Sequence, residues 1–275
     1  MELCRSHNKV ITTMKKILIA SLLALTSISA FAAPDQSGLD PAFAKVQQYL
    51  QAKNYTAAYT ELDVMAKAGN AQAMYNQAYM IQMGQGTAKN NGKALKLYQE
   101  SSDKGYSVAS YVLAQSYATG ELGLTKDAKK SKTYLEKASS QGFDDATLEL
   151  AVMAFAEGKD KEALQRIDPL IKKGNSQAIH TKALYDITQG YKTKNETLVK
   201  QGLNAIRDLA TKGYVPALMA VANMMTNGNI IEQNLPEAKK IYTALAKDNI
   251  PKAKESLDVV NKLLAEQAKQ PAPKK

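Results

Sequence analysis

Residues 105–142 read GYSVASYVLAQSYATGELGLTKDAKKSKTYLEKASSQG, and the spacing within this stretch decides the fold that we expect. The stretch opens and closes on glycine and carries small residues at Ala109 and Ala114. On both sides of Gly120, apolar residues recur every three or four positions, which is the period of an amphipathic helix. The stretch therefore predicts two helices, joined by a turn at a glycine and ended by a glycine.

The same spacing recurs along the chain: a glycine, an alanine four residues later, and a second alanine five residues after that. Copies begin at Gly69, Gly105, Gly142, Gly174 and Gly213, and a degenerate last copy begins at Asn249. The five intervals between residues 69 and 249 average 36 residues. One helix pair of that length cannot bury its own apolar face, whereas stacked pairs can. The repeat therefore predicts a stack of helix pairs.

Other residues recur with the alanines in the two best copies. The first copy contains Ala73, Ala78, Gly84-Gln85-Gly86, Lys93-Ala94, Tyr98 and Gly105. The second contains Ala109, Leu113-Ala114, Tyr117, Gly120, Tyr134, Ala138 and Gly142. This pattern resembles the Sel-1-like repeat family, a relative of the tetratricopeptide repeats with a slightly longer unit. The resemblance covers residues 41–262 and is strongest over 69–142.

The repeat and the resemblance together imply an all-α protein, a right-handed α-α superhelical solenoid of about six helix-pair repeats with a terminal capping helix. We expect the repeat domain to span residues 41–268, preceded by a linker at 33–40 and followed by a flexible tail at 269–275. Two units depart from the pattern: 142–174 is short, and in 174–213 the residues 190–196 read as a longer connection between helices.

Residues 1–32 have the features of a secretory signal peptide. Lys15 and Lys16 precede a short apolar run at 17–25, and the run of small residues that follows ends at Ala32. We predict cleavage after Ala32. The protein is then an exported, bacterial member of the resembled family and is located in the periplasm. The apolar run is too short to span a bilayer, so no membrane anchor is expected after cleavage. Residues 1–13 read as a spurious extension upstream of a second methionine, Met14.

The charge of the chain is strongly positive, at +10. Residues 1–32 carry a net +3, which leaves 32 basic and 25 acidic residues, or +7, in the mature protein. Such an excess favours an anionic partner through long-range attraction. The lysines are interspersed with acidic residues, however, as in a solvated helical surface, so we expect no nucleic-acid partner.

Few residues are available for chemistry. The single cysteine, Cys4, lies in the segment to be removed, and His180 is the only histidine of the mature chain. Thiolate nucleophiles, cysteine-based zinc sites and histidine-based triads are therefore not expected. Asp144 and Asp145 lie where a helix begins, which is typical of residues that stabilise the helix terminus. We predict no catalytic residue, no metal and no cofactor.

Tyrosine is the abundant aromatic residue, with 14 copies and no tryptophan. Tyr98, Tyr134 and Tyr242 occupy packing positions of second helices and are predicted to lie in the core. Tyr75 and Tyr111 each follow the first alanine of their unit by two residues. We expect these two side chains to lie on the concave face of the solenoid and to bind a partner.

Three functions fit the sequence. The first is an envelope scaffold or adaptor that binds a protein or peptide, as members of the resembled family commonly do. The second is binding of peptidoglycan or another anionic glycan by the basic surface. The third is hydrolysis of β-lactams, which the resemblance implies only for members stapled by cysteine pairs, and the mature chain has no cysteine. We therefore expect a protein that is not an enzyme.

Overall fold

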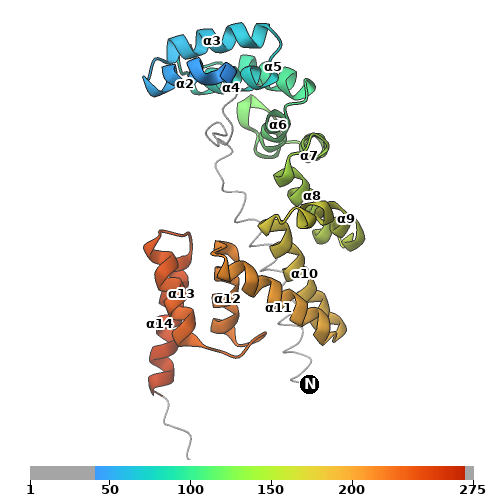
Figure 1. Cartoon of the computed structure of the whole chain (residues 1–275), viewed down its shortest axis with the longest axis vertical. Coiled ribbons are helices and arrows are strands. Elements are labelled where there is room, and N and C mark those ends of the chain that lie inside the picture. The colour runs from blue at the N-terminus through green and yellow to red at the C-terminus, as the bar shows by residue number, and fades with distance from the viewer. Residues whose placement is uncertain (1–40, 270–275) are drawn as a thin grey trace, which may run out of the picture. The chain divides into compact units, whose positions relative to one another are not determined.

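The computed structural model describes residues 41–269, and within this range it contains thirteen α-helices, two short 3₁₀ helices and no strand (Figure 1). The 3₁₀ helices are η1 (Pro41–Phe43) and η2 (Glu121–Gly123). The predicted all-α helical repeat is confirmed. Residues 1–32, 33–40 and 270–275, on which the predicted signal peptide, linker and most of the predicted tail fall, lie outside the described residues.

The α-helices form six consecutive pairs followed by one more helix. The first three pairs are α2 (Ala44–Gln51) with α3 (Tyr55–Lys67), α4 (Ala71–Met83) with α5 (Asn91–Asp103), and α6 (Ser107–Thr119) with α7 (Ala128–Ser140). They are followed by α8 (Asp144–Ala156) with α9 (Asp160–Lys172), α10 (Ser176–Thr193) with α11 (Glu196–Thr211), α12 (Val215–Asn227) with α13 (Leu235–Lys247), and α14 (Ala253–Lys269).

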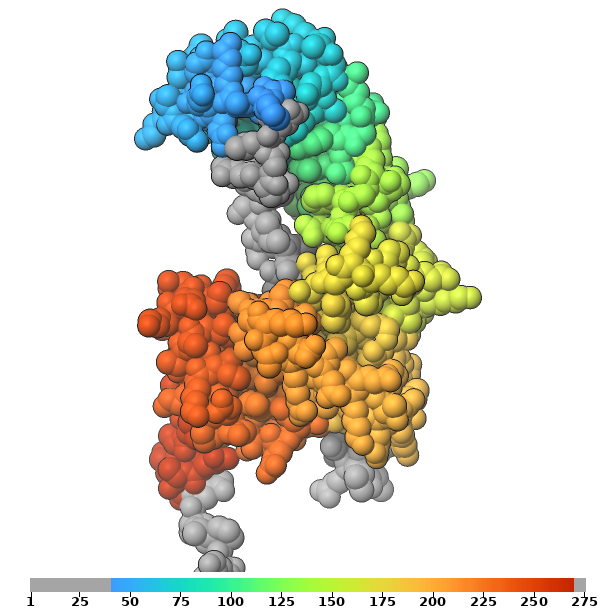
Figure 2. Space-filling view, in the orientation of Figure 1, coloured from blue at the N-terminus to red at the C-terminus, as the bar shows by residue number. Residues whose placement is uncertain are grey.

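The described residues divide into two compact units, 41–167 and 168–269, and the division falls within α9. Within each unit, successive helix pairs form successive bands of colour on the surface (Figure 2). Each unit also has its own buried clusters of Leu, Ile, Ala and aromatic side chains. A single repeat domain over 41–268 stays a prediction.

The ends of the helices follow from local sequence. All five repeat glycines have positive φ, between 77° at Gly174 and 95° at Gly105, and Asn249 has a φ of 56°. This left-handed conformation ends a helix, as the spacing predicted. At the opposite ends, seven helices begin after an asparagine or aspartate whose side chain accepts a backbone N–H. These capping residues are Asn54, Asn70, Asn90, Asp127, Asn175, Asn195 and Asn234.

One expectation about the connections was wrong. Residues 190–193 are not part of a loop, because α10 continues to Thr193 and is 18 residues long, while α11 has 16. The inserted residues lengthen both helices, and only Lys194 and Asn195 connect them. Two glycines allow the helices to approach closely. A Cβ atom added at Gly190 would lie 2.6 Å from Val199 Cγ2, and one at Gly202 would lie 2.5 Å from the Ala183 carbonyl oxygen.

Candidate functional site

Apart from α2, which carries Lys45, the helices of residues 41–167 form two rows, which we call the first helices (α4, α6 and α8) and the second helices (α3, α5, α7 and α9). Side-chain contacts link neighbours within each row. Among the first helices, the Gln115 side chain of α6 donates a 3.0 Å hydrogen bond to Glu149 of α8. Among the second helices, Lys137 of α7 pairs with Asp103 of α5 at 2.6 Å.

The two rows differ sharply in charge. The first helices contain no lysine or arginine: α4 and α6 have no charged residue at all, and the charges of α8 are Asp144, Asp145 and Glu149. The second helices carry the basic residues, including four lysines on α7 alone. Among these seven helices, the basic side chains therefore lie on the second helices, while α4, α6 and α8 are neutral or acidic.

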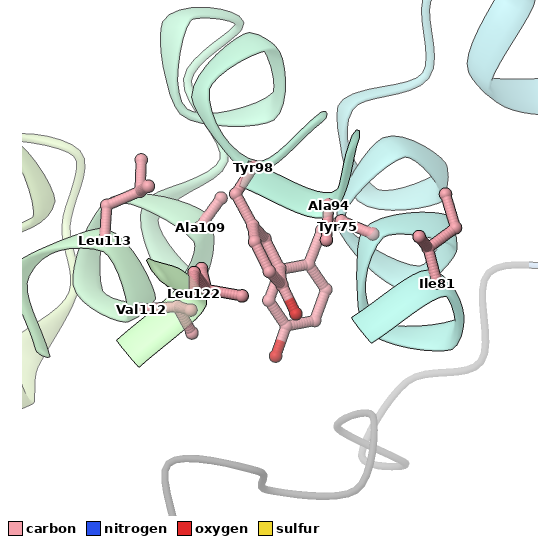
Figure 3. Packing of buried hydrophobic residues seen from close by; sticks show 9 residues of the cluster. Tyr75, Ile81, Ala94, Tyr98, Ala109, Val112, Leu113 and Leu122 are labelled. Carbon is pink, nitrogen blue, oxygen red and sulfur yellow. The ribbon is translucent and has the colours of Figure 1, made fainter. Parts of the chain in front are cut away.

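Tyr75, one of the two predicted binding residues, lies in the core. Its side chain is 6% exposed and belongs to a buried cluster that joins α4, α5 and α6. Figure 3 shows its ring beside that of Tyr98, and the two ring centroids are 5.5 Å apart. The expectation of an exposed Tyr75 is corrected by this burial. Its physical reason is the aromatic residue at the start of the next first helix, Tyr106, whose ring packs against Tyr75 with 5.2 Å between centroids.

Tyr111, the second predicted binding residue, lies on α6 and is half-buried. Its ring packs against Phe143 with 4.8 Å between centroids. Gln115 and Ala118 follow it at helical spacing, and Ala118 is exposed. Tyr111 thus lies at one end of a stripe of α6 that reaches the surface, next to the start of α8.

Glu149 of α8 places a carboxylate beside Tyr111 and Gln115. It is half-buried, lies within hydrogen-bonding reach of the Tyr111 hydroxyl, and accepts the bond from Gln115. Burial raises the pKa of Glu149, and Asp145 raises it further, against the lowering effect of the two hydrogen bonds. The pKa of Asp145 is raised by its own burial and by the neighbouring Asp144.

We define the first-helix face as the surface that these residues form between α6 and α8. It consists of Tyr111, Gln115, Ala118, Asp145, Glu149 and Val152, which are half-buried or exposed. Sequence reasoning singled out only Tyr111 as a binding residue. Gln115 and Glu149 were missed because they lie 34 residues apart, and the repeat spacing does not indicate which positions of neighbouring first helices meet. The absence of basic residues from the first helices was a signal that the sequence did contain.

The other residues that the sequence analysis named are three tyrosines and two aspartates. Tyr98 and Tyr242 are buried, as predicted, at 0% and 1% exposure, while Tyr134 is half-buried and stacks on Tyr117. Asp144 and Asp145 lie in the first turn of α8, although the helix is preceded by Phe143 and no side chain caps it. In residues 41–269, no group of three or more histidine, cysteine, aspartate or glutamate side chains is placed to hold a metal ion.

The helix pairs and their glycine and alanine spacing define an α-helical repeat protein. More particularly, the Sel1 repeat family matches residues 71–106, 107–143 and 215–249, so the chain carries three Sel1 repeats and the predicted resemblance is confirmed. Sel1 repeat proteins generally mediate protein–protein interactions, and their fold is typically a non-catalytic scaffold. No curated protein sequence matches the chain.

Two solved structures share the fold. A Sel1 repeat protein from Oxalobacter formigenes is 23% identical with a TM-score of 0.66, and the match covers 85% of this chain and 99% of that one. A protective antigen present in uropathogenic Escherichia coli strains, which displays an SLR fold, is 22% identical with a TM-score of 0.62. That match covers 79% of this chain and 48% of the antigen, so this chain spans about half the antigen's length.

Within the described residues 41–269, none of the helices combines the length and the apolar character that a membrane crossing requires.

Proposed function

We propose that this protein is a periplasmic scaffold or adaptor, which binds a protein or peptide of the cell envelope on the first-helix face and performs no catalysis. The observation that carries the proposal is the difference between the two rows of helices. The first-helix face combines half-buried aromatic and polar side chains without any basic residue, as on α6 and α8. Aromatic residues with few lysines are typical of protein-binding surfaces.

The periplasmic location rests on the sequence. Lys15 and Lys16, the apolar run at 17–25 and the small residues ending at Ala32 support export and cleavage after Ala32. Mass spectrometry of the protein from the periplasmic fraction of its host gives the mature N-terminus directly. We expect a chain that begins at Ala33; an uncleaved chain in the cytoplasm would contradict the proposed location.

The binding surface is tested by cross-linking in the living host. A photoreactive amino acid placed at Ala118, which is exposed on α6, reports on the first-helix face. A matched probe at Thr133, which is exposed on α7, reports on the second helices of the same unit. We expect one protein to cross-link reproducibly at position 118 and not at position 133. Cross-linking at neither position, or only at position 133, would contradict the proposed surface.

The lysines of α7 favour a second candidate function, the binding of an anionic envelope glycan. Lys129 of α7 is exposed and has no acidic partner among residues 41–269, and Lys126 precedes the helix. Attraction of this kind weakens as salt screens the charges. Sedimentation of the mature protein with purified peptidoglycan, at low and at high salt, tests it. Binding that high salt abolishes, and that Lys129→Gln weakens, would establish this second function on the opposite row of helices.

A further inference from the structure

The first-helix face carries carboxylates and no basic residue, so its charge favours a positively charged partner. Building on the proposed function, we infer that the bound segment is basic and that one of its lysine or arginine side chains lies against Glu149 and the ring of Tyr111, between α6 and α8. The proposal names a surface and a ligand chemistry: a cationic peptide segment.

Lysine and arginine are absent from the three first helices. The mature chain carries seven more basic than acidic residues, yet α4, α6 and α8 contain no lysine or arginine. A basic segment approaching this row therefore meets no repulsion from the helices it contacts, whereas at α5 and α7 it would face lysines. An acidic segment would be drawn instead to α7, which carries four lysines and one glutamate.

Glu149 and Asp145 of α8 differ from several carboxylates of the second helices, which are ion paired. Glu136, for example, lies 2.9 Å from Arg166. Glu149 and Asp145 interact with each other and with neutral or acidic groups only, and no lysine or arginine acts on either carboxylate. A half-buried carboxylate without a cation is incompletely solvated, so a cation supplied by a partner gains more there than at a fully exposed carboxylate.

The side chain of Glu149 is held in place by its neighbours. The amide of Gln115 donates to it at 3.0 Å, and the hydroxyl of Tyr111 lies within reach of the same carboxylate. Tyr111 is itself fixed against Phe143. A carboxylate that is already oriented loses little side-chain freedom when it binds a cation, and an aromatic ring beside it attracts the same cation.

The test measures binding of the purified mature protein to three fluorescein-labelled peptides of equal length. Their alternate positions carry lysine, serine or glutamate, with alanine between them. Glu149→Gln removes the charge and keeps the size of the side chain. Glu100→Gln, at an exposed position of α5, removes one negative charge from the second helices and is the matched control. Circular dichroism verifies that both variants remain folded.

We expect the lysine peptide to bind more tightly than the serine peptide, and the glutamate peptide not to bind to this face. Glu149→Gln should weaken binding of the lysine peptide about tenfold, and Glu100→Gln should leave it nearly unchanged. Because the pKa of Glu149 is raised by burial, affinity for the lysine peptide should fall on acidification at a higher pH than that of an ordinary glutamate.

Equal binding of the three peptides, or equal weakening by Glu149→Gln and Glu100→Gln, would overturn the inference. This outcome is separate from failure of the proposed function. A partner that cross-links at position 118 through a neutral or acidic segment would leave the scaffold in place and refute only the basic ligand. Absence of any cross-link at position 118 would remove the scaffold surface itself.

Discussion

His180 of α10 packs against Tyr214, with 5.7 Å between the ring centroids in an edge-on arrangement. His180 follows the first alanine of its unit by two residues, and Tyr214 follows the next repeat glycine. The same two repeat positions are paired in two other places, Tyr75 with Tyr106 and Tyr111 with Phe143. The repeat thus places an aromatic contact between successive first helices, and His180 takes a position that tyrosine occupies elsewhere.

Burial of His180 predicts a loss of stability in acid. The side chain is 5% exposed, its Nε2 atom has no hydrogen-bond partner, and the ring is within hydrogen-bonding reach of the Pro216 backbone. Burial lowers the pKa of His180 from 6.5 to about 4. Below pH 6.5 the unfolded chain therefore binds a proton that the folded chain excludes. This contribution to the free energy of unfolding is complete above that pH and is lost as the pH falls to about 4, by roughly 3 kcal/mol.

Denaturant unfolding between pH 4 and pH 7 measures this effect when wild type is compared with His180→Leu. The corresponding position of the preceding repeat is Leu148, so leucine is compatible with the fold. The free energy of unfolding of the variant should depend less on pH over this range. Parallel pH profiles for the two proteins would show that His180 is protonated without cost in the folded state.

Two glycine substitutions should have opposite effects on stability, because Gly202 lies where α10 and α11 approach closely and Gly92 lies on the exposed start of α5. In Gly202→Ala the new Cβ atom would lie 2.5 Å from the Ala183 carbonyl oxygen, so the two helices must separate. We expect a loss of about 1–3 kcal/mol in the free energy of unfolding. In Gly92→Ala, on the exposed start of α5, the nearest atom is 3.6 Å away, and alanine should stabilise the helix by up to about 1 kcal/mol. Thermal unfolding of the two variants measures both effects. A Gly202→Ala protein more stable than wild type would contradict the close packing of α10 against α11.

A buried polar network predicts a large effect at Ser110. Its hydroxyl lies 2.7 Å from that of Ser102 and donates to Gln141 at 2.6 Å. Ser110→Ala leaves both partners without this bond and should lower the free energy of unfolding by about 1–3 kcal/mol. Ser140→Ala removes an exposed hydroxyl of α7 and serves as control, with a change within about 0.5 kcal/mol. Equal effects would show that the network contributes nothing beyond an exposed hydrogen bond.

The core position of Tyr75 predicts that its loss damages the fold before it damages binding. Tyr75→Ala should lower the free energy of unfolding by about 3–5 kcal/mol, as for other large buried side chains. Tyr111→Phe keeps the contact with Phe143 and should change stability little. A Tyr75→Ala protein that unfolds like wild type, yet no longer binds its partner, would restore Tyr75 as a surface residue.

The sequence was sufficient for the repeat and for the ends of most helices, because these depend on local chemistry. Gly105 and Gly142, for example, end helices whatever their neighbours are, and positive φ at both confirms this. Contacts between successive units were not predictable from the spacing alone. The burial of Tyr75 depends on the ring of Tyr106 in the next unit, and the position of Glu149 depends on Gln115 of the preceding one.

The insertion in the unit 174–213 was misread for a similar reason. Residues 190–196, which begin with Gly190, were predicted to form a connection between helices. In the structure Gly190 is required inside α10, since a side chain there would collide with Val199 of α11. Only the position of the second helix reveals that the glycine serves a close contact rather than a turn.

Hydrogen–deuterium exchange of the mature protein, alone and with the partner captured at position 118, shows whether partners bind the first helices of residues 41–167. We predict that binding slows exchange at the surface residues of α6 and α8 and leaves α5 and α7 unchanged. Slower exchange confined to α5 and α7 would contradict binding at the first helices and assign it to the second helices.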